Sequence, residues 1–332
     1  MSTPAPPRLL LCAAVLLAVM AAPAAASQVS YDGTTLHYTA GAGESNNLLY
    51  TVNPYDTLCA PVAAPCLSIS DRARIAFPPG RCVLNSSDTF GDRVYCDLPQ
   101  EIHTDLGDGD DAMWGWDGRD VIDAGPGNDN PIYGGAGNDV ISGGPGGDVL
   151  IGGLGDDVTD GGRGDDDFEG IPNAHEGATA TSGSDTYVGG GGYDSITYED
   201  RSEDLNLSPD GVADDGAPGE GDNVHRATSR VDATNFPDTI TGATAHFEVQ
   251  AFDGDDVIHG GPAADTLDAG YGNDQVFTGG GADYVMGYYG DDVITSRDGD
   301  AAFRIDCGEG DDTVIADPSD PIWPGCETVD VG

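Results

Sequence analysis

Aspartates that recur at a fixed interval are the residues of this chain with the clearest chemical potential. Asp139, Asp148, Asp157 and Asp166 follow one another at nine-residue intervals within residues 134–169. Carboxylates can form an acid–base catalytic pair, or they can hold a cation. A catalytic pair does not explain why an aspartate recurs every nine residues, whereas a row of cation sites does. The interval therefore favours a row of cation ligands.

Each of these aspartates occupies the sixth position of a nine-residue block. The four blocks read GGAGNDVIS, GGPGGDVLI, GGLGDDVTD and GGRGDDDFE. Each interior glycine costs a helix about 1 kcal/mol relative to alanine, and glycine suits turns with positive φ. The last three positions favour β structure, and position 8 points inward with Ile141, Leu150, Thr159 and Phe168, of which only the threonine is not apolar. A chain that alternates such turns and short strands can coil into a solenoid of parallel strands.

The block resembles G-G-x-G-x-D-x-U-x, the nonapeptide of calcium-binding RTX proteins, the secreted bacterial proteins with haemolysin-type repeats. The resemblance implies an all-β fold, namely a right-handed parallel β-roll with two nonapeptides per coil. Residues 18 apart then stack, which brings Asp139 near Asp157 and Asp148 near Asp166, about 5 Å apart. Such carboxylates repel each other unless a cation lies between them. Their oxygens suit calcium, whose binding would then supply folding energy.

The nine-residue spacing of aspartates continues on both sides of these four blocks. A first array begins near Leu106, residues 170–180 are degenerate with His175 where an aspartate belongs, and a second array runs cleanly from Ala251. The position-6 residues predicted to bind multiple calcium ions are Asp111, Asp120, Asp129, Asp139, Asp148, Asp157, Asp166, Asp185, Asp194, Asp238, Asp256, Asp265, Asp274, Asp283, Asp292 and Asp312.

We predict five segments along the chain. Residues 1–26 are a secretory signal peptide, because Arg8 precedes a short apolar run and small residues precede Ser27. The others are a small disulfide-tied β module that caps the roll (27–104), a first RTX β-roll array (105–197), an acidic spacer (198–232), and a second array with a disulfide-closed C-terminal cap (233–332). A protein of this plan is expected outside the cell.

Six cysteines follow the signal peptide, an even number that favours disulfides in an exported protein. Fifteen pairings are possible for six cysteines. Proximity in the sequence suggests Cys59 with Cys66, Cys82 with Cys96, and Cys307 with Cys326.

The charge balance limits the partners. The chain carries 59 acidic and 12 basic residues, for a net charge of −47. Such a balance argues against nucleic acid and anionic membranes as partners. The apolar run of the signal peptide is too short for a permanent membrane span. Within the spacer, the acidic residues 214–223 suit a solvated loop better than one more calcium site.

The sequence favours a protein that binds calcium and is not an enzyme, with a structural, surface or matrix role. Its six histidines are scattered, with no HExxH, and no G-x-S-x-G motif lies in a strand–turn–helix context. The alternative is a secreted enzyme, polysaccharide-active or protease-like, or a haemolysin-like toxin that carries RTX repeats. In the enzyme alternative, a cell-surface or matrix polysaccharide is the expected partner, and a sugar-binding face is predicted from Tyr193, Tyr198, Tyr271, Tyr284, Tyr288 and Tyr289.

Overall fold

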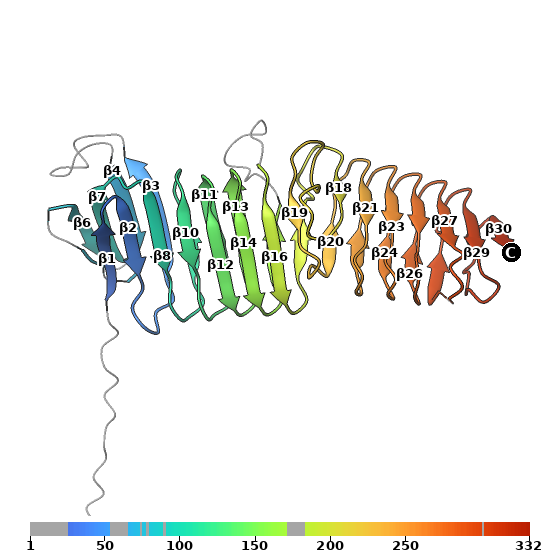
Figure 1. Cartoon of the computed structure of the whole chain (residues 1–332), viewed down its shortest axis with the longest axis horizontal. Coiled ribbons are helices and arrows are strands. Elements are labelled where there is room, and N and C mark those ends of the chain that lie inside the picture. Colours follow the sequence, from blue (N-terminus) through green and yellow to red (C-terminus); the bar gives the residue numbers. More distant parts are fainter. Residues whose placement is uncertain are drawn as a thin grey trace, which may run out of the picture.

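The structure, a computed structural model, describes residues 26–53, 66–73, 75–77, 80–88, 91–170, 183–300 and 302–332. All regular structure in these ranges is β-strand. Short strands follow one another as coils stacked along one long axis, with the N-terminal module at one end and the C-terminus at the other (Figure 1). The predicted all-β roll with parallel sheets is confirmed. The predicted signal peptide and His175 lie outside the described residues.

The N-terminal module is antiparallel, unlike the rest of the molecule. Its strands are β1 (Ser27–Asp32), β2 (Thr35–Thr39), β3 (Asn47–Asn53), β4 (Cys66–Asp71), β5 (Ile75–Ala76), β6 (Cys82–Asp88) and β7 (Gly91–Asp97). The pairs β1–β2, β3–β4, β4–β7 and β6–β7 all run antiparallel. Alternating apolar residues such as Leu36, Tyr38 and Ile69 turn inward and are buried. The apolar residues of the module are continuous with the core of the roll.

Both predicted disulfides that fall within the described residues are present. Cys82 is bonded to Cys96 in the module, and Cys307 to Cys326 near the C-terminus. Cys66 is also disulfide-bonded, but its predicted partner Cys59 lies outside the described residues.

The module supplies the first strands of the roll. Strand β2 pairs in parallel with β8 (Glu101–Asp105), and β3 pairs in parallel with β9 (Ala112–Trp114). An uncovered strand edge invites further pairing. Here the module covers the first edge of two sheets.

Three sheets make up the roll. The N-terminal sheet continues from β8 through β10 (Asp120–Asp123), β12 (Val140–Pro145), β14 (Val158–Arg163), β16 (Thr186–Gly191) and β19 (Asn223–Val224). The long sheet continues from β9 through β11 (Ile132–Ala136), β13 (Val149–Leu154), β15 (Asp167–Glu169), β17 (Ser195–Thr197), β20 (Arg230–Asp232), β22 (Glu248–Gln250), β24 (Thr266–Asp268), β26 (Tyr284–Met286) and β28 (Arg304–Asp306). The C-terminal sheet contains β18 (Asn206–Leu207), β21 (Thr239–Thr241), β23 (Val257–His259), β25 (Gln275–Phe277), β27 (Val293–Ser296), β29 (Thr313–Ala316) and β30 (Thr328–Val331).

The register of the sheets follows the predicted 18-residue step. Leu150 pairs with Phe168 in the long sheet, and Ile258 pairs with Val276 in the C-terminal sheet. These position-8 side chains are buried and form the core between the sheets. Each coil therefore contains two blocks, and the core is one inward side chain per block.

The predicted acidic spacer contains strands of all three sheets. Within residues 198–232, β19 pairs with β16, and β20 pairs with β17 and β22. The long sheet is therefore continuous across this region, whereas the N-terminal sheet ends at β19 and the C-terminal sheet begins at β18. Residues 198–222, which include β18, form an insertion between β17 and β19. The part of the chain that the structure describes holds no helix that could span a bilayer.

Candidate metal centre

The glycines at block position 4 allow the turns to stack without any side chain between them. A Cβ added to Gly146, which has φ +152°, would lie 1.4 Å from the carbonyl oxygen of Gly127 in the preceding coil. One added to Gly272, with φ +147°, would lie 1.5 Å from the carbonyl oxygen of Gly254. Neither the backbone conformation nor the space admits another residue. Main-chain carbonyl oxygens therefore lie against the next turn along the stack.

The position-6 aspartates all lie inside these turns. Each of the sixteen predicted ligands is buried, with at most 3% of its surface exposed. The main-chain N–H of Asp139 donates to Oδ1 of Asp157 at 2.7 Å, and that of Asp256 donates to Oδ1 of Asp274 at 2.8 Å. The stacking of residues 18 apart is thus made by the aspartates themselves.

These bonds continue from coil to coil as four ladders, in which each member's N–H donates to the carboxylate of the next. Ladder 1 is Asn46, Asp111, Asp129, Asp148, Asp166 and Asp194. Ladder 2 is Asp120, Asp139, Asp157, Asp185 and Asp222. Ladder 3 is Leu205, Asp238, Asp256, Asp274, Asp292, Asp312 and Glu327, and ladder 4 is Phe247, Asp265 and Asp283.

The second carboxylate oxygen of most members has no donor. Buried Oδ2 atoms without a hydrogen-bond partner belong to Asp111, Asp129, Asp139, Asp148, Asp157, Asp166, Asp194, Asp222, Asp256, Asp274, Asp283, Asp292 and Asp312. A buried polar atom without a partner is costly, and proteins rarely retain one without a reason. A row of them at the same block position indicates that something other than the protein satisfies them.

The donor set of these turns suits a hard cation. It consists of one carboxylate from each coil together with main-chain carbonyl oxygens. Among the described residues, no three Asp, Glu, His or Cys side chains gather at one point. Oxygen ligands in a flexible arrangement are those that calcium accepts.

Comparison with known families supports the same conclusion. The family described as RTX calcium-binding nonapeptide repeat (4 copies) matches residues 106–131, 133–168, 179–197, 250–285 and 277–300. This chain carries RTX-type calcium-binding repeats. No curated protein matches it. The ladders of this RTX-type protein extend beyond the matched segments, because Asp222, Asp238, Asp312 and Glu327 belong to them as well.

Burial makes these carboxylates hard to ionise without a cation. It raises the pKa of Asp139 and Asp274 to about 7, and the pKa of Asp157 and Asp256 to about 8. The ladder N–H that each one accepts lowers its pKa, but by less than burial raises it. At neutral pH the RTX turns therefore favour either a proton or a cation beside each aspartate.

Three predicted ligands of the RTX turns differ from the others, because their second oxygen accepts an N–H of their own turn. Oδ2 of Asp120, Asp238 and Asp265 accepts the N–H of the residue four positions earlier, at 2.7–2.9 Å. Position 4 of these blocks holds Gly118, Phe236 and Ala263, none with a positive φ. The chain thus caps these three carboxylates within their own turns. Asp238 and Asp265, whose two oxygens both accept an N–H, are weaker candidates for calcium than the rest, whereas Asp120 keeps a buried Oδ1 without a partner.

Sequence reasoning missed two acidic members of the ladders. Asp222 is fully buried and accepts the N–H of Asp185 at 2.9 Å, although residues 214–223 were expected to form a solvated loop. Glu327 accepts the N–H of Asp312 at 2.9 Å. The available signal was the triplet Asp222-Asn223-Val224, which repeats the end of a block. The insertion hid it by stretching the spacing from Asp185 to 37 residues.

A second row of polar side chains follows block position 5 on the outside of the turns. Asp255 accepts the N–H of Asn273 at 2.8 Å, and Asn273 accepts the N–H of Asp291 at 3.0 Å. These bonds run opposite to those of the inner ladders. Asparagine between aspartates reduces the repulsion along the row.

Proposed function

We propose that this RTX-type protein is a secreted calcium-binding protein whose roll is completed by calcium, with a structural role at a cell surface or in a matrix. The observation that carries the proposal is the row of buried Oδ2 atoms without donors. Their repetition along ladders 1, 2 and 3 is what a series of cation sites requires.

The two carboxylate oxygens of a ladder aspartate have different roles in such a site. Oδ1 of each aspartate except Asp120 is held by the N–H of the preceding coil, which fixes the direction of the carboxylate. Oδ2 then lies toward the first glycine of its own block: a Cβ added to Gly143 would lie 2.4 Å from Oδ2 of Asp148 and 2.8 Å from the carbonyl oxygen of Gly161 in the next coil. Calcium, when bound, supplies the positive charge that offsets the burial of these acids.

The way the acids are used supports a structural role rather than catalysis. The buried aspartates are fixed to successive coils by main-chain bonds and recur at one phase. Acid–base chemistry instead needs a pair of carboxylates held apart in different environments. Export and an extracellular location are supported by the signal peptide predicted from the sequence and by the disulfides Cys82–Cys96 and Cys307–Cys326.

A second candidate function is contact with a polysaccharide. Tyr271 and Tyr289 stack with ring centroids 4.8 Å apart and an interplanar angle of 5°, and both are exposed. Flat exposed rings present an apolar face that suits a sugar ring. The predicted face is wrong at Tyr198, which is fully buried in the core beside Tyr187. The double variant Tyr271→Ala/Tyr289→Ala should lose binding to soluble polysaccharides in calorimetry, with circular dichroism as the folding control.

Isothermal titration with calcium tests the main proposal. The chain from Ser27, stripped of metal, should bind several ions in the extracellular range of about 10⁻⁴–10⁻³ M, with a concurrent rise in β signal by circular dichroism. Absence of binding at millimolar calcium would overturn it. Sustained turnover of a polysaccharide or peptide substrate in the presence of calcium would overturn the non-catalytic role.

A further inference from the structure

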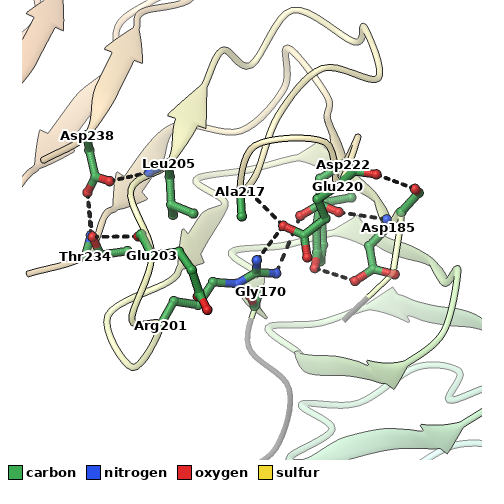
Figure 2. A network of polar contacts seen from close by, with 12 residues as sticks. Gly170, Asp185, Arg201, Glu203, Leu205, Ala217, Glu220, Asp222, Thr234 and Asp238 are labelled. Carbon is green, nitrogen blue, oxygen red and sulfur yellow. Dashed lines mark hydrogen bonds and ion pairs between the residues drawn. The ribbon is translucent and has the colours of Figure 1, made fainter. Parts of the chain in front are cut away.

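Arg201 is a buried cation at the point where the insertion interrupts the roll. Among the arginines that the structure describes, it alone is buried, with 4% of its side chain exposed. It follows β17, and its N–H bonds to the carbonyl of Tyr198 at 2.9 Å. From there its side chain reaches the last member of ladder 2 (Figure 2).

The guanidinium is surrounded by acceptors. Nη1 donates to Oε2 of Glu220 at 2.5 Å, and Nε donates to the carbonyl of Gly170 at 2.5 Å. Nη2 lies 3.7 Å from Oδ2 of Asp222, an ion-pair distance. Glu220 is itself held, because the same Oε2 accepts the N–H of Ala217 at 2.8 Å (Figure 2). Two buried carboxylates and a carbonyl therefore converge on one permanent positive charge.

Asp222 makes this arrangement comparable with the other rungs. Its Oδ1 accepts the N–H of Asp185, as every ladder aspartate does for its predecessor. Its Oδ2, like those of the other rungs, has no hydrogen-bond partner, but here the guanidinium of Arg201 lies 3.7 Å away. Oδ2 of Asp185 accepts the hydroxyl of Tyr187 at 3.2 Å. At this rung the chain itself supplies a group for each second oxygen.

The identity of the cation matters because its charge is permanent. A guanidinium stays protonated in proteins, and its planar donors suit carboxylates. Its presence does not depend on the calcium concentration. We propose that Arg201 takes the place of a calcium ion at the last rung of ladder 2, and thereby keeps the junction of β16 with β19 and β17 with β20 folded without calcium. This inference rests on the proposed calcium binding of the other rungs.

Hydrogen exchange of the full chain in chelator tests the inference. Peptides covering residues 183–190 and 220–226 should exchange more slowly than peptides covering residues 134–168 and 251–296. In Arg201→Met the junction should exchange faster by a factor on the order of a hundred in chelator, and regain protection in calcium, which can then occupy the space between Glu220 and Asp222. Arg230→Met is the matched control, since Arg230 pairs with Asp232 at a side chain 35% exposed. It should change the junction little.

Three outcomes would overturn the inference: a wild-type junction as unprotected in chelator as the rest of the roll, an Arg201→Met junction still protected in chelator, or equal effects of the two substitutions. If Arg201→Met is unprotected in calcium as well, Arg201→Lys decides. It keeps the charge, so protection in chelator supports the inference and its loss overturns it. Calcium titration of the wild type separates this result from a failure of the proposed function, which would appear as no binding at all.

Discussion

The N-terminal module and the roll differ in how often a buried acidic side chain is left without a donor. In the module, the buried Asp71 receives the hydroxyls of Tyr38 and Ser27 on Oδ2 and the N–H of Asn47 on Oδ1. In the roll, an aspartate such as Asp148 receives one N–H on Oδ1 and nothing on Oδ2. Protein donors therefore satisfy both oxygens of Asp71. The module has one buried acid with an unpartnered oxygen, Oδ1 of Asp92, among its described residues, whereas in the roll such an oxygen recurs along the ladders.

The apolar cores of the two regions differ in the same sense. The module packs large residues such as Tyr38, Leu48 and Leu67 together and carries the Cys82–Cys96 disulfide. The roll has one inward side chain for each nine-residue block, such as Ile141 or Leu150. The comparison teaches that the module can hold its fold by burial and covalent bonds, whereas the roll depends on what neutralises its acids.

Chelation should produce the largest difference between the two regions. Removal of calcium should abolish hydrogen-exchange protection over residues 134–168 and 251–296, because the buried Oδ2 atoms lose their only partner. The module should keep its protection over residues 91–97. Exchange measured by mass spectrometry in calcium and in chelator gives both values at once. Equal loss in the two regions would contradict the comparison.

A substitution at position 4 should have the next largest effect, and only in the roll. Gly272→Ala should lower the free energy of unfolding in calcium by about 3 kcal/mol, because its Cβ would overlap the carbonyl of Gly254. Gly299→Ala is the control, since Gly299 has φ +93° with open space around it, and it should cost about 1 kcal/mol. Urea denaturation in excess calcium measures both. Equal costs would mean that stacking of the turns does not limit this position.

The pH dependence of the metal-free roll should be inverted relative to that of most proteins. Its aspartates have raised pKa values in the fold, about 7 for Asp139 and about 8 for Asp157, against 3.8 when unperturbed. The folded roll thus binds more protons than the unfolded chain between about pH 4 and 8, so its stability falls as pH rises through that window. In chelator, β signal should be greater at pH 5 than at pH 8. Calcium should bind more tightly at pH 8 than at pH 5, because fewer protons compete for the carboxylates. Tighter binding at pH 5 would contradict the raised pKa values.

Two aspartates of the second array offer the smallest and sharpest test. Asp274→Asn removes a charge whose Oδ2 has no donor, so it should stabilise the metal-free roll by about 1 kcal/mol and weaken calcium binding. Asp265→Asn should destabilise by about 1–3 kcal/mol both with and without calcium, because its amide would face the N–H of Gly261 or Phe247. Thermal unfolding in the two buffers distinguishes them. The same sign for both variants in chelator would show that capping makes no difference.

Periodicity predicted most of the fold because it specifies both the turn and the inward side chain. The pairing of Leu150 with Phe168 and the bond between Asp139 and Asp157 both follow from an 18-residue coil. The disulfides Cys82–Cys96 and Cys307–Cys326 followed from proximity along the chain.

The predictions that failed concern residues at which the nine-residue repeat is interrupted. The insertion after β17 carried Tyr198 into the core and moved Asp222 out of phase, although the coil closes around both. The capped state of Asp265 depends on the conformation of its turn, and Ala263 at position 4 was its only trace in the sequence. Spacing identifies which residues stack, but not which carboxylate oxygen finds a donor.

The ladders give the solenoid a direction, since every inner bond runs from an N–H of one coil to a carboxylate of the next. Such a column has unlike ends and, left open, would accept another molecule head to tail. Asn46 covers the first carboxylate of ladder 1, and Glu327 covers the last N–H of ladder 3. These two residues close one end of each of their ladders. A closed end opposes the head-to-tail addition of a second molecule, so the coil can repeat many times within one protein without growing into a filament.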